Sequence, residues 1–430
     1  MEDNYDYIIL GTGLVECVIS TILSKKGKRV LQIDHNPTYG SETRTLSYKE
    51  LKDKFGQGDT LCPLLASLNR HFSIDLAPKL LLADGNMKKV LAKYEISATV
   101  SFVQIQGSYI YRNKKVYTVP ASEKASLKSS AISLWQKPRV TAFFWNVKKY
   151  AETKKVPSRK TMQEEFDYYG LDKNSIEFIG HAIALNLDDE YLQKPPSQTF
   201  DKIVMYIRSL LCYNEPHPYI YPLYGLSEIS QSFSRKAGMY GATFMLNTPV
   251  ENIIVDDQVS VEIIHPLSKE KVAVRCSHVI GAPFYFMSRV KTTKEVIRAI
   301  CIVKGEIKLV KSGQLIFLKS EFGRLNDIFM VILGEKEKTV PEGYSLAIIS
   351  TVRETDNPET ELKPIIDKLG DIKECFIETR KLYEPLKLYD KISILKSVDQ
   401  TTHLETAYDE IVRICKELGV ADELNDISEY

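Results

Sequence analysis

The first 34 residues carry a hydrophobic pattern that changes from strand to helix and back to strand. Residues 5–10 (YDYIIL) are mostly apolar, as expected for a strand that is buried on both faces of a sheet. Leu14, Val18 and Ile22 then recur at every fourth position, which places them on one side of a helix. Residues 30–34 (VLQID) form the next apolar run. The pattern predicts a strand–helix–strand unit of the α/β class.

The rest of the chain divides into a helical middle and a second half rich in strands. Residues 72–94 predict a pair of helices, and residues 101–119 predict strands. From about 121 to 214 apolar residues recur at helical spacing, as in Val140, Phe143, Phe144 and Val147. Further strands are predicted near residues 243–247, 250–264, 271–283, 301–309, 327–333, 344–352 and 392–396. We therefore expect C-terminal strands to complete the N-terminal unit, with a helical segment inserted between them.

Composition narrows the kinds of partner that the chain can have. The 430 residues carry a formal net charge of +1, so no overall field favours nucleic acid or an anionic membrane. The seven cysteines are scattered without CxxC spacing, which is typical of reduced thiols and not of disulfides or a zinc site. The N-terminus enters a strand directly, and no apolar run approaches about 18 residues, so we expect neither a signal peptide nor a membrane span. These features favour a cytoplasmic protein of two domains.

The turn after the first strand contains part of a dinucleotide-binding motif. Gly11 and Gly13 match the first two glycines of that motif, but Glu16 stands where the third is expected. The helix dipole favours a glutamate there, yet its charge and bulk would lie beside a bound pyrophosphate, at a cost of several kcal/mol by a rough Coulomb estimate. Asp34 stands where an acid could bind a ribose, although acids at strand ends are common. We therefore expect a fold that keeps the turn and binds no cofactor.

Longer motifs occur in a fixed order along the chain and identify a family. They are LGTGLVECVIS, IDHNPTYG, IDLAPKLLLADG, GHAIALNLDDEYL, YPLYGLSEISQSFSR, YGATFMLNTPVENI and TTHLETAYDEI. From about residue 4 to 418 the chain closely resembles the Rab GDP-dissociation inhibitors and, more distantly, the Rab escort proteins. The resemblance implies a flavoprotein-like (FAD/NAD-binding-like) large domain of the α/β class, formed by residues 1–120 and 215–430. Residues 121–214 would form an inserted, smaller, all-helical domain that binds prenyl lipid.

The resemblance implies regulation without catalysis. Such proteins bind prenylated Rab GTPases in the GDP form, slow GDP dissociation, extract the Rabs from membranes and keep them soluble for recycling in vesicle trafficking. The implied protein is a cytoplasmic monomer that visits membranes transiently and takes no nucleic acid, metal or cofactor. Two alternatives stay open, namely a Rab escort protein that presents Rabs for geranylgeranylation and an FAD-dependent oxidoreductase. A relative that has lost Rab binding is a third.

The resemblance assigns Rab contacts to Tyr39, Arg70, Glu228, Arg235, Thr243 and Met245. Glu228 and Arg235 are seven positions apart in a helical stretch, so they share a face. Strand alternation places Phe244 toward the core and leaves Met245 as an adaptable apolar side chain on the exposed face. The residues alone also allow structural roles. Glu228 and Arg235 could be a solvated charge pair, and Arg70 a solvated surface charge. Tyr39 could be a core tyrosine, and Met245 could pack beneath a loop.

A prenylated partner also requires a place for its lipid. Exposing a geranylgeranyl group to water costs on the order of ten kcal/mol, at about 0.8 kcal/mol per CH₂, and clefts between helices can part around such a chain. The candidate lining residues in the helical segment are Phe143, Val147, Ile179, Ile183, Ile207 and Leu210. A helical core that binds no lipid would show the same apolar stripes. Residues 210–222 (LLCYNEPHPYIYP) resemble the loop by which the family is thought to contact membranes, although Cys212 replaces a family arginine.

Overall fold

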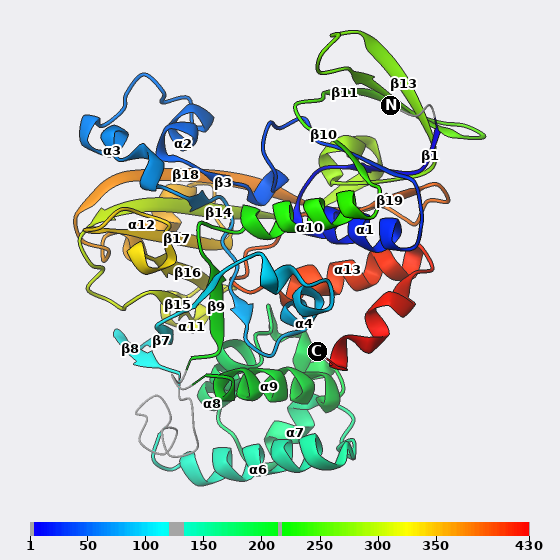
Figure 1. Cartoon of the computed structure of the whole chain (residues 1–430). Coiled ribbons are helices and arrows are strands. Elements are labelled where there is room, and N and C mark those ends of the chain that lie inside the picture. Colours follow the sequence, from blue (N-terminus) through cyan, green and yellow to red (C-terminus); the bar gives the residue numbers. More distant parts are fainter. Residues whose placement is uncertain (1–3, 120–132, 214–216, 430) are drawn as a thin grey trace.

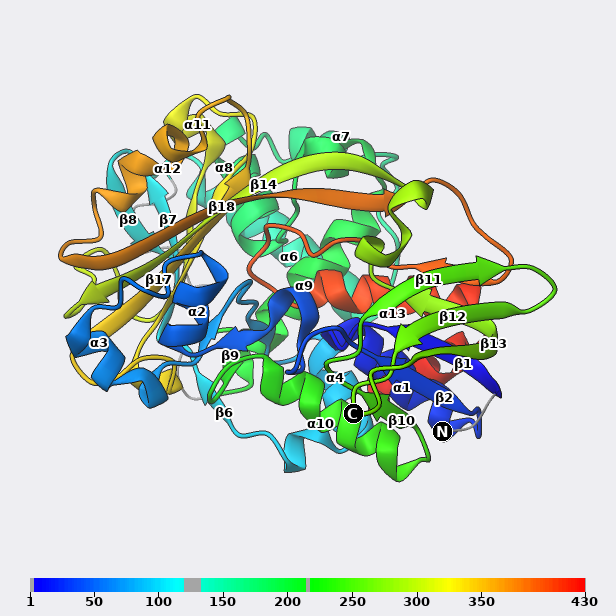
Figure 2. The same ribbon diagram turned by 90° about the horizontal axis from the view of Figure 1, so that it is seen from above.

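The computed structural model describes residues 4–119, 133–213 and 217–429, and within these ranges two seven-stranded sheets carry the fold (Figure 1). The two sheets stand next to each other when the molecule is seen from above, and the long strands β14 and β18 of the second sheet run toward the first (Figure 2). The predicted domain boundaries, at 120–121 and 214–215, lie outside the described residues. The division into domains therefore stays a prediction.

The first sheet contains the N-terminal strand–helix–strand unit. Its members are β1 (Asn4–Leu10), β2 (Val30–Ile33), β10 (Thr243–Met245), β11 (Val250–Val255), β12 (Val259–Ile264), β13 (Lys271–Gly281) and β19 (Ile392–Ile394). β10, β2, β1, β13 and β19 run parallel, whereas β11 and β12 join as an antiparallel extension. Ile8 of β1 pairs with Leu31 on one side and with Val279 on the other. The prediction that C-terminal strands complete the N-terminal unit is confirmed.

Helices cover one face of this sheet, and a second apolar cluster forms on the other. α1 (Leu14–Lys25) packs against both α10 (Ser227–Met239) and α13 (Glu405–Glu417). The cluster on the opposite face joins Ile8 and Ile33 to Val261 of β12. The sheet is therefore buried on both faces around β1, which explains why residues 5–10 are almost wholly apolar.

The second sheet has the order β18-β14-β17-β16-β15-β7-β8. Its strands are β7 (Gly107–Arg112), β8 (Lys115–Thr118), β14 (Val290–Lys304), β15 (Gly313–Phe317), β16 (Ile328–Leu333), β17 (Tyr344–Val352) and β18 (Ile372–Pro385). The hydrophobic pattern did not predict β15 or β18, and it predicted β14 at 301–309, too far toward the C-terminus. Half of the residues of β18 are polar, without regular alternation, and the segment is held as a strand by antiparallel pairing with β14.

Helices fill the described part of the inserted segment, 133–213, as predicted. They are α6 (Lys137–Thr153), α7 (Met162–Tyr168), α8 (Lys173–Glu177), the π-helix η4 (Phe178–Ile183), the 3-10 helix η5 (Asp189–Gln193) and α9 (Pro196–Leu211). In Figure 1 they gather at the bottom of the molecule. His181 of η4 ties them to the second sheet, because its Nδ1 lies 2.5 Å from Oδ2 of Asp327 beside β16.

The predicted helix pair at 72–94 is wrong. The segment holds one helix, α4 (Asn86–Lys93), preceded by the short strands β4 (Ile74–Asp75) and β5 (Leu81–Leu82). β5 pairs with residues 219–220, with Leu81 opposite Ile220. β4 pairs with residues 45–46. Pro78 lies between the two strands, and its missing amide hydrogen disfavours a continuous helix there.

Shorter elements complete the chain. The strands are β3 (Thr45–Leu46), β6 (Phe102–Gln104) and β9 (Tyr219–Pro222), and the helices are α2 (Tyr48–Lys54), α3 (Pro63–Ser67), α11 (Lys319–Phe322) and α12 (Pro358–Ile366). The 3-10 turns are η1 (Ser41–Thr43), η2 (Asn69–His71), η3 (Ile96–Ala98), η6 (Pro283–Arg289), η7 (Glu335–Glu337) and η8 (Ala421–Glu429).

Candidate functional site

The glycine turn between β1 and α1 is closed by the protein's own side chains. Gly11 has a φ of 113°, which glycine adopts readily. The backbone amide of Thr12 donates to Oδ2 of Asp34 at 2.9 Å and to Oγ of Ser41 at 2.7 Å. The Thr12 hydroxyl donates to the same Asp34 oxygen at 2.6 Å. A backbone amide that could hold a phosphate in this kind of turn is therefore already occupied.

Glu16 fills the space that the missing third glycine would have left. It is buried, and a Cβ atom built on Gly13 would lie 2.5 Å from its Oε2, which shows how closely the carboxyl group covers the turn. Burial raises the pKa of Glu16 to about 8. The expected negative charge is therefore wrong for neutral pH, where the group is mostly protonated. The bulk of the Glu16 side chain leaves no room for a pyrophosphate at this turn.

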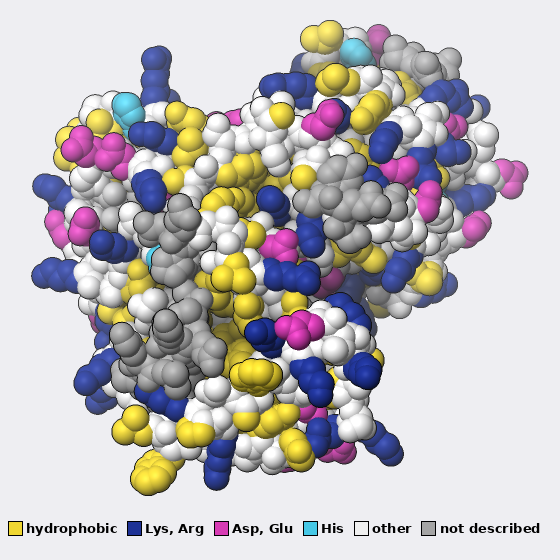
Figure 3. Space-filling model, turned by 60° about the horizontal axis from the view of Figure 1, so that its bottom comes forward, with side chains coloured by type: hydrophobic (Ala, Val, Ile, Leu, Met, Phe, Trp, Pro, Cys, Tyr) yellow, Lys and Arg dark blue, Asp and Glu magenta, His cyan; other side chains and the backbone are white. Residues whose placement is uncertain are grey.

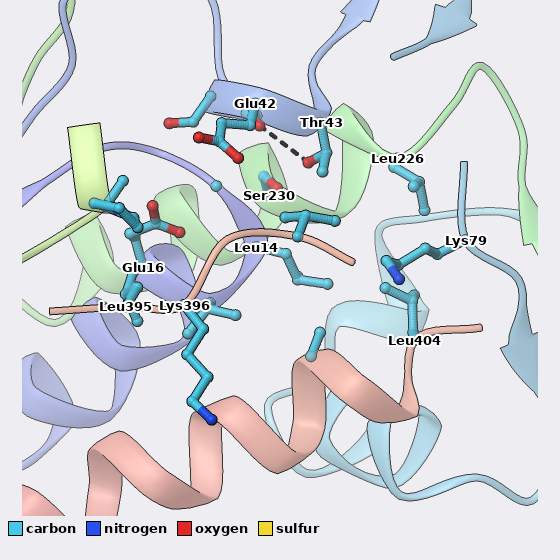
Figure 4. A pocket seen from close by; sticks show the side chains of 18 residues that line it. Leu14, Glu16, Glu42, Thr43, Lys79, Leu226, Ser230, Leu395, Lys396 and Leu404 are labelled. Atoms are coloured by element: carbon cyan, nitrogen blue, oxygen red, sulfur yellow. Dashed lines mark hydrogen bonds between the residues drawn. The ribbon is translucent and has the colours of Figure 1, made fainter. Parts of the chain in front are cut away.

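The remaining crevice is too small for a dinucleotide. Figure 4 shows Leu14 and Glu16 on α1 and Lys396 on the neighbouring segment around it. The cavity has a volume of about 70 Å³, whereas ligand pockets are commonly about 300–1,000 Å³. The residues present do not fit a flavin or nicotinamide dinucleotide. In the described part of the chain, no group of three or more His, Cys, Asp or Glu side chains is placed to hold a metal ion.

Sequence reasoning missed two of the groups that close the turn, Thr12 and Ser41. Asp34 was noted only as a possible ribose ligand, but it accepts hydrogen bonds from both residues and from the amide of Asn36 at 2.8 Å. A hydroxyl residue between the two glycines was the available signal, because it can donate to an acid at the end of the next strand.

The helix α10 has the two faces that its pattern predicts. Ile229 and Phe233 are buried, while Glu228 and Arg235 are exposed on the outside. Ser227 does not cap the helix through its side chain. Instead its Oγ donates to the carbonyl of Tyr39 at 3.0 Å and accepts from the amide of Thr45 at 2.8 Å. Ser227 thus joins the start of α10 to the 39–45 segment.

β10 lies at the edge of the first sheet and brings Phe244 next to Tyr39. The rings of Phe244 and Tyr39 meet edge to face, with their centroids 6.2 Å apart, and both residues are half-buried. Thr243 is exposed, as expected. Met245 is not on an open face, because it is half-buried and packs against the apolar cluster that contains Ile33. The expectation of an exposed Met245 is wrong in this respect, since the far face of the sheet carries its own core.

The predicted contact residues do not all lie in one group. Tyr39, Glu228 and the end of β10 are joined through Ser227 and Phe244. Arg70 is exposed on η2, which is anchored elsewhere, because Oδ1 of Asn69 accepts from the amide of Lys49 at 2.7 Å. The contacts around Arg70 thus belong to α2 and not to α10.

The six predicted lipid-lining residues lie in the apolar interior. Phe143, Val147, Ile179, Ile183 and Leu210 are buried, and Ile207 is half-buried. The ring of Phe143 contacts those of Phe144, Phe166, Tyr169 and Phe200, with centroids 5.3–5.8 Å apart. The helices therefore already fill the space between them with these side chains.

The predicted membrane loop, 210–222, begins in the last turn of α9 and ends in β9. Residues 214–216 lie outside the described residues, and Leu211 and Tyr213 before them are exposed. Tyr219 and Tyr221 are fully buried in β9, between β5 and β6, so their expected exposure is wrong. The Tyr221 hydroxyl donates to the buried carboxyl group of Asp75.

The described part of the chain has no helix that is long and apolar enough to cross a membrane.

Comparison with known proteins agrees with this geometry. A family model described as GDP dissociation inhibitor matches residues 1–427. The chain is 38% identical to the "Probable secretory pathway GDP dissociation inhibitor 1" of Schizosaccharomyces pombe, over 98% of this chain and 97% of that protein. It is 35% identical to the Rab GDP dissociation inhibitor beta of Rattus norvegicus, over 97% and 95% of the two chains.

Solved structures show the same relationship and a shared fold. The crystal structure of Rab GDI from Plasmodium falciparum superposes with a TM-score of 0.89 at 34% identity, covering 97% of this chain and 98% of that chain. An oxidoreductase from Methanosarcina mazei superposes with a TM-score of 0.61 at 14% identity, covering 95% and 99%, which shows a flavoprotein-like fold alone. The chain belongs to the GDP dissociation inhibitor family, a family of regulators and not of enzymes.

Proposed function

We propose that this protein binds prenylated Rab GTPases in the GDP form, slows GDP release, extracts the Rabs from membranes and keeps them soluble for recycling. The observation that carries the proposal is the family match along residues 1–427, together with near-complete coverage of relatives named as Rab GDP dissociation inhibitors. The proposed protein is a cytoplasmic monomer with transient membrane contact.

The proposed Rab contacts are Tyr39, Arg70, Glu228, Arg235, Thr243 and Met245. GDP and GTP forms of a GTPase differ mainly in the order of their switch loops, so a partner prefers one form only through differential contacts with those loops. The exposure of Glu228, Arg235 and Thr243 supports a role for them as polar contacts. Met245 packs against the apolar cluster beneath the first sheet. Met245→Asp would place a carboxylate against this cluster, so it is expected to reduce stability as well as binding.

The proposed lipid site lies among Phe143, Val147, Ile179, Ile183, Ile207 and Leu210. Because these side chains pack together, the helices need to part before a geranylgeranyl chain can enter. The π-helix η4, which holds Ile179 and Ile183, is an irregular point in the bundle, and such helices frequently occur at functional sites. This irregularity supports an opening there.

The proposed membrane contact lies at the helical end of the molecule. Leu211 is 75% exposed, and Trp135 and Trp145, before and on α6, are 88% and 65% exposed. Lys148 and Lys149 lie beside Trp145 on α6 and are exposed. On the face that Figure 3 shows, hydrophobic side chains gather toward this end with Lys and Arg around them. Tryptophan and basic residues together favour the boundary of an anionic membrane.

Extraction from membranes tests the proposal. The protein would be added to membranes that carry prenylated Rab, loaded either with GDP or with a non-hydrolysable GTP analogue, and released Rab would be measured. We expect release in the GDP state only. Equal release in both states, or none, would refute it. Tight binding to the Rab prenyltransferase would instead favour the escort function.

A further inference from the structure

A second and larger cavity lies beside the closed crevice, on the face of the second sheet. Its volume is about 390 Å³. It is bounded by β14, β18, η6 and the segment after β19, with Ala77 and Glu42 on its remaining side. Apolar side chains form much of its wall, including Val296, Leu382 and Val398. Such a volume falls within the usual range for small-molecule sites.

A buried arginine with spare donors lines this cavity. Arg298 of β14 is only 5% exposed. Its Nε donates to Oγ of Ser350 at 2.9 Å. Across the residues that the structure describes, its two terminal nitrogens donate to no acceptor and form no ion pair, and they are not sealed from the cavity. Buried guanidinium groups normally find acceptors for these donors, since leaving them unpaired is costly.

The nearest acidic group is already engaged by other cations. Glu378 lies opposite Arg298 across the β14–β18 ladder. Its Oε2 accepts from Nζ of Lys54 at 2.7 Å, and its Oε1 lies 3.1 Å from Nε of Arg380. Arg380, which pairs with Val296, lines the same cavity on the same sheet face as Arg298. Glu42 and Lys381 also line the cavity, so its wall carries three cationic residues and one carboxylate, an excess of two positive charges.

Burial lowers the pKa of Arg298 to about 10; the carboxylate of Glu378 opposes this effect, and the charge of Arg380 adds to it. The group still carries its charge at neutral pH. A buried cation of this kind is stabilised when an anion reaches it.

We propose that this cavity is a binding site for a phosphate group, held by the Arg298 guanidinium with help from Arg380. Two terminal N–H edges of a planar guanidinium match two oxygens of one phosphate, which gives the bidentate geometry that arginine favours. A phosphate dianion suits a site with two guanidinium groups. The volume and the apolar wall leave room for a small organic substituent on the phosphate. The site is separate from the proposed Rab contacts and does not depend on them.

Titration calorimetry with inorganic phosphate tests the site, at constant ionic strength against a chloride blank. We expect saturable binding at one site in the unaltered protein, weakened at least tenfold by Arg380→Ala and abolished by Arg298→Met. Arg298→Lys keeps the charge but loses the planar fork, so binding is expected to fall between these results. Arg208→Ala, which removes an exposed arginine from α9, is the matched control and is expected to bind phosphate normally.

Three outcomes would overturn the proposal. The first is that the unaltered protein shows no saturable heat beyond the chloride blank. The second is that Arg380→Ala binds phosphate as well as the control does, a test that does not rely on the buried Arg298. The third comes from parallel titrations with glycerol 3-phosphate and succinate. We expect the phosphate monoester to bind at least as well as inorganic phosphate, and tighter binding of succinate would contradict the choice of phosphate.

Discussion

The glycine turn and the surface around Tyr39 lie close to each other on the first sheet, yet their polar groups behave in opposite ways. At the turn, the amide and hydroxyl of Thr12 and the hydroxyl of Ser41 all donate to one oxygen of Asp34. At the surface, Glu228 and Arg235 are exposed, and their side chains form no hydrogen bond or ion pair with the described residues. Groups with internal partners are not available to a ligand, whereas exposed groups are. The place where this fold could hold a cofactor is therefore filled by internal hydrogen bonds, whereas the polar groups of the outer surface are available for recognition.

The largest effect on the closed turn is expected from removing the Asp34 carboxylate. Asp34→Ala leaves the buried Thr12 hydroxyl and the buried amide of Asn36 without their acceptor. Hydrogen bonds to a charged acceptor contribute about 1.5–3 kcal/mol each, so we expect the free energy of unfolding to fall by roughly 3 kcal/mol or more. Denaturation in urea measures this. Asp356→Ala, at a fully exposed aspartate, is the control and is expected to change stability by less than about 0.5 kcal/mol. Equal effects of the two substitutions would show that the turn is not locked.

The next largest effect concerns the proton on Glu16. Its pKa of about 8 in the folded protein exceeds the ordinary value of 4.5, so the folded state binds more protons than the unfolded state between these values. Stability should therefore be greatest below about pH 4.5 on account of this group, and should fall by up to about 1.4 kcal/mol per pH unit as pH rises toward 8. Glu16→Gln cannot titrate and should lose this slope. Unfolding curves between pH 5 and 8 would show it, and parallel slopes for both proteins would mean that Glu16 is charged when folded.

The smallest expected effect concerns the open surface itself. Phe244→Leu removes the edge-to-face contact with Tyr39, and such ring pairs contribute about 0.5–1.5 kcal/mol. We expect a loss of stability of about 1 kcal/mol. A double-mutant cycle with Tyr39→Leu would measure the interaction energy of the two rings. A coupling energy near zero would mean that the contact between Tyr39 and Phe244 of β10 does not contribute to stability.

Much of the fold and part of the candidate site could be predicted from the sequence. Local spacing identified β1, α1 and β2, and the missing third glycine marked a filled turn. The protonation of Glu16 could not be predicted, because it depends on burial by residues that are distant in the chain. Tyr219 and Tyr221 resembled loop residues because Pro216 and Pro218 precede them.

Partners that are remote in sequence explain the remaining errors. Tyr219 and Ile220 become a strand only by pairing with residues 81–82 and 104. Met245 was expected to be exposed because strand alternation reveals two faces but does not tell what covers each one. Its cover comes from β11, β12 and their neighbours, which follow it in the chain. Arg298 gave no signal, since a lone arginine within an apolar strand has no local pattern.

The affinity for prenylated Rab loaded with GDP tests the central claim most directly, measured for Glu16→Gln and Arg235→Ala beside the unaltered protein. We expect Arg235→Ala to weaken binding about tenfold or more, which corresponds to about 1.4 kcal/mol, without loss of stability. Glu16→Gln is expected to bind as the unaltered protein does. Unchanged affinity in Arg235→Ala together with a large loss in Glu16→Gln would show that recognition depends on the turn and not on the outer surface.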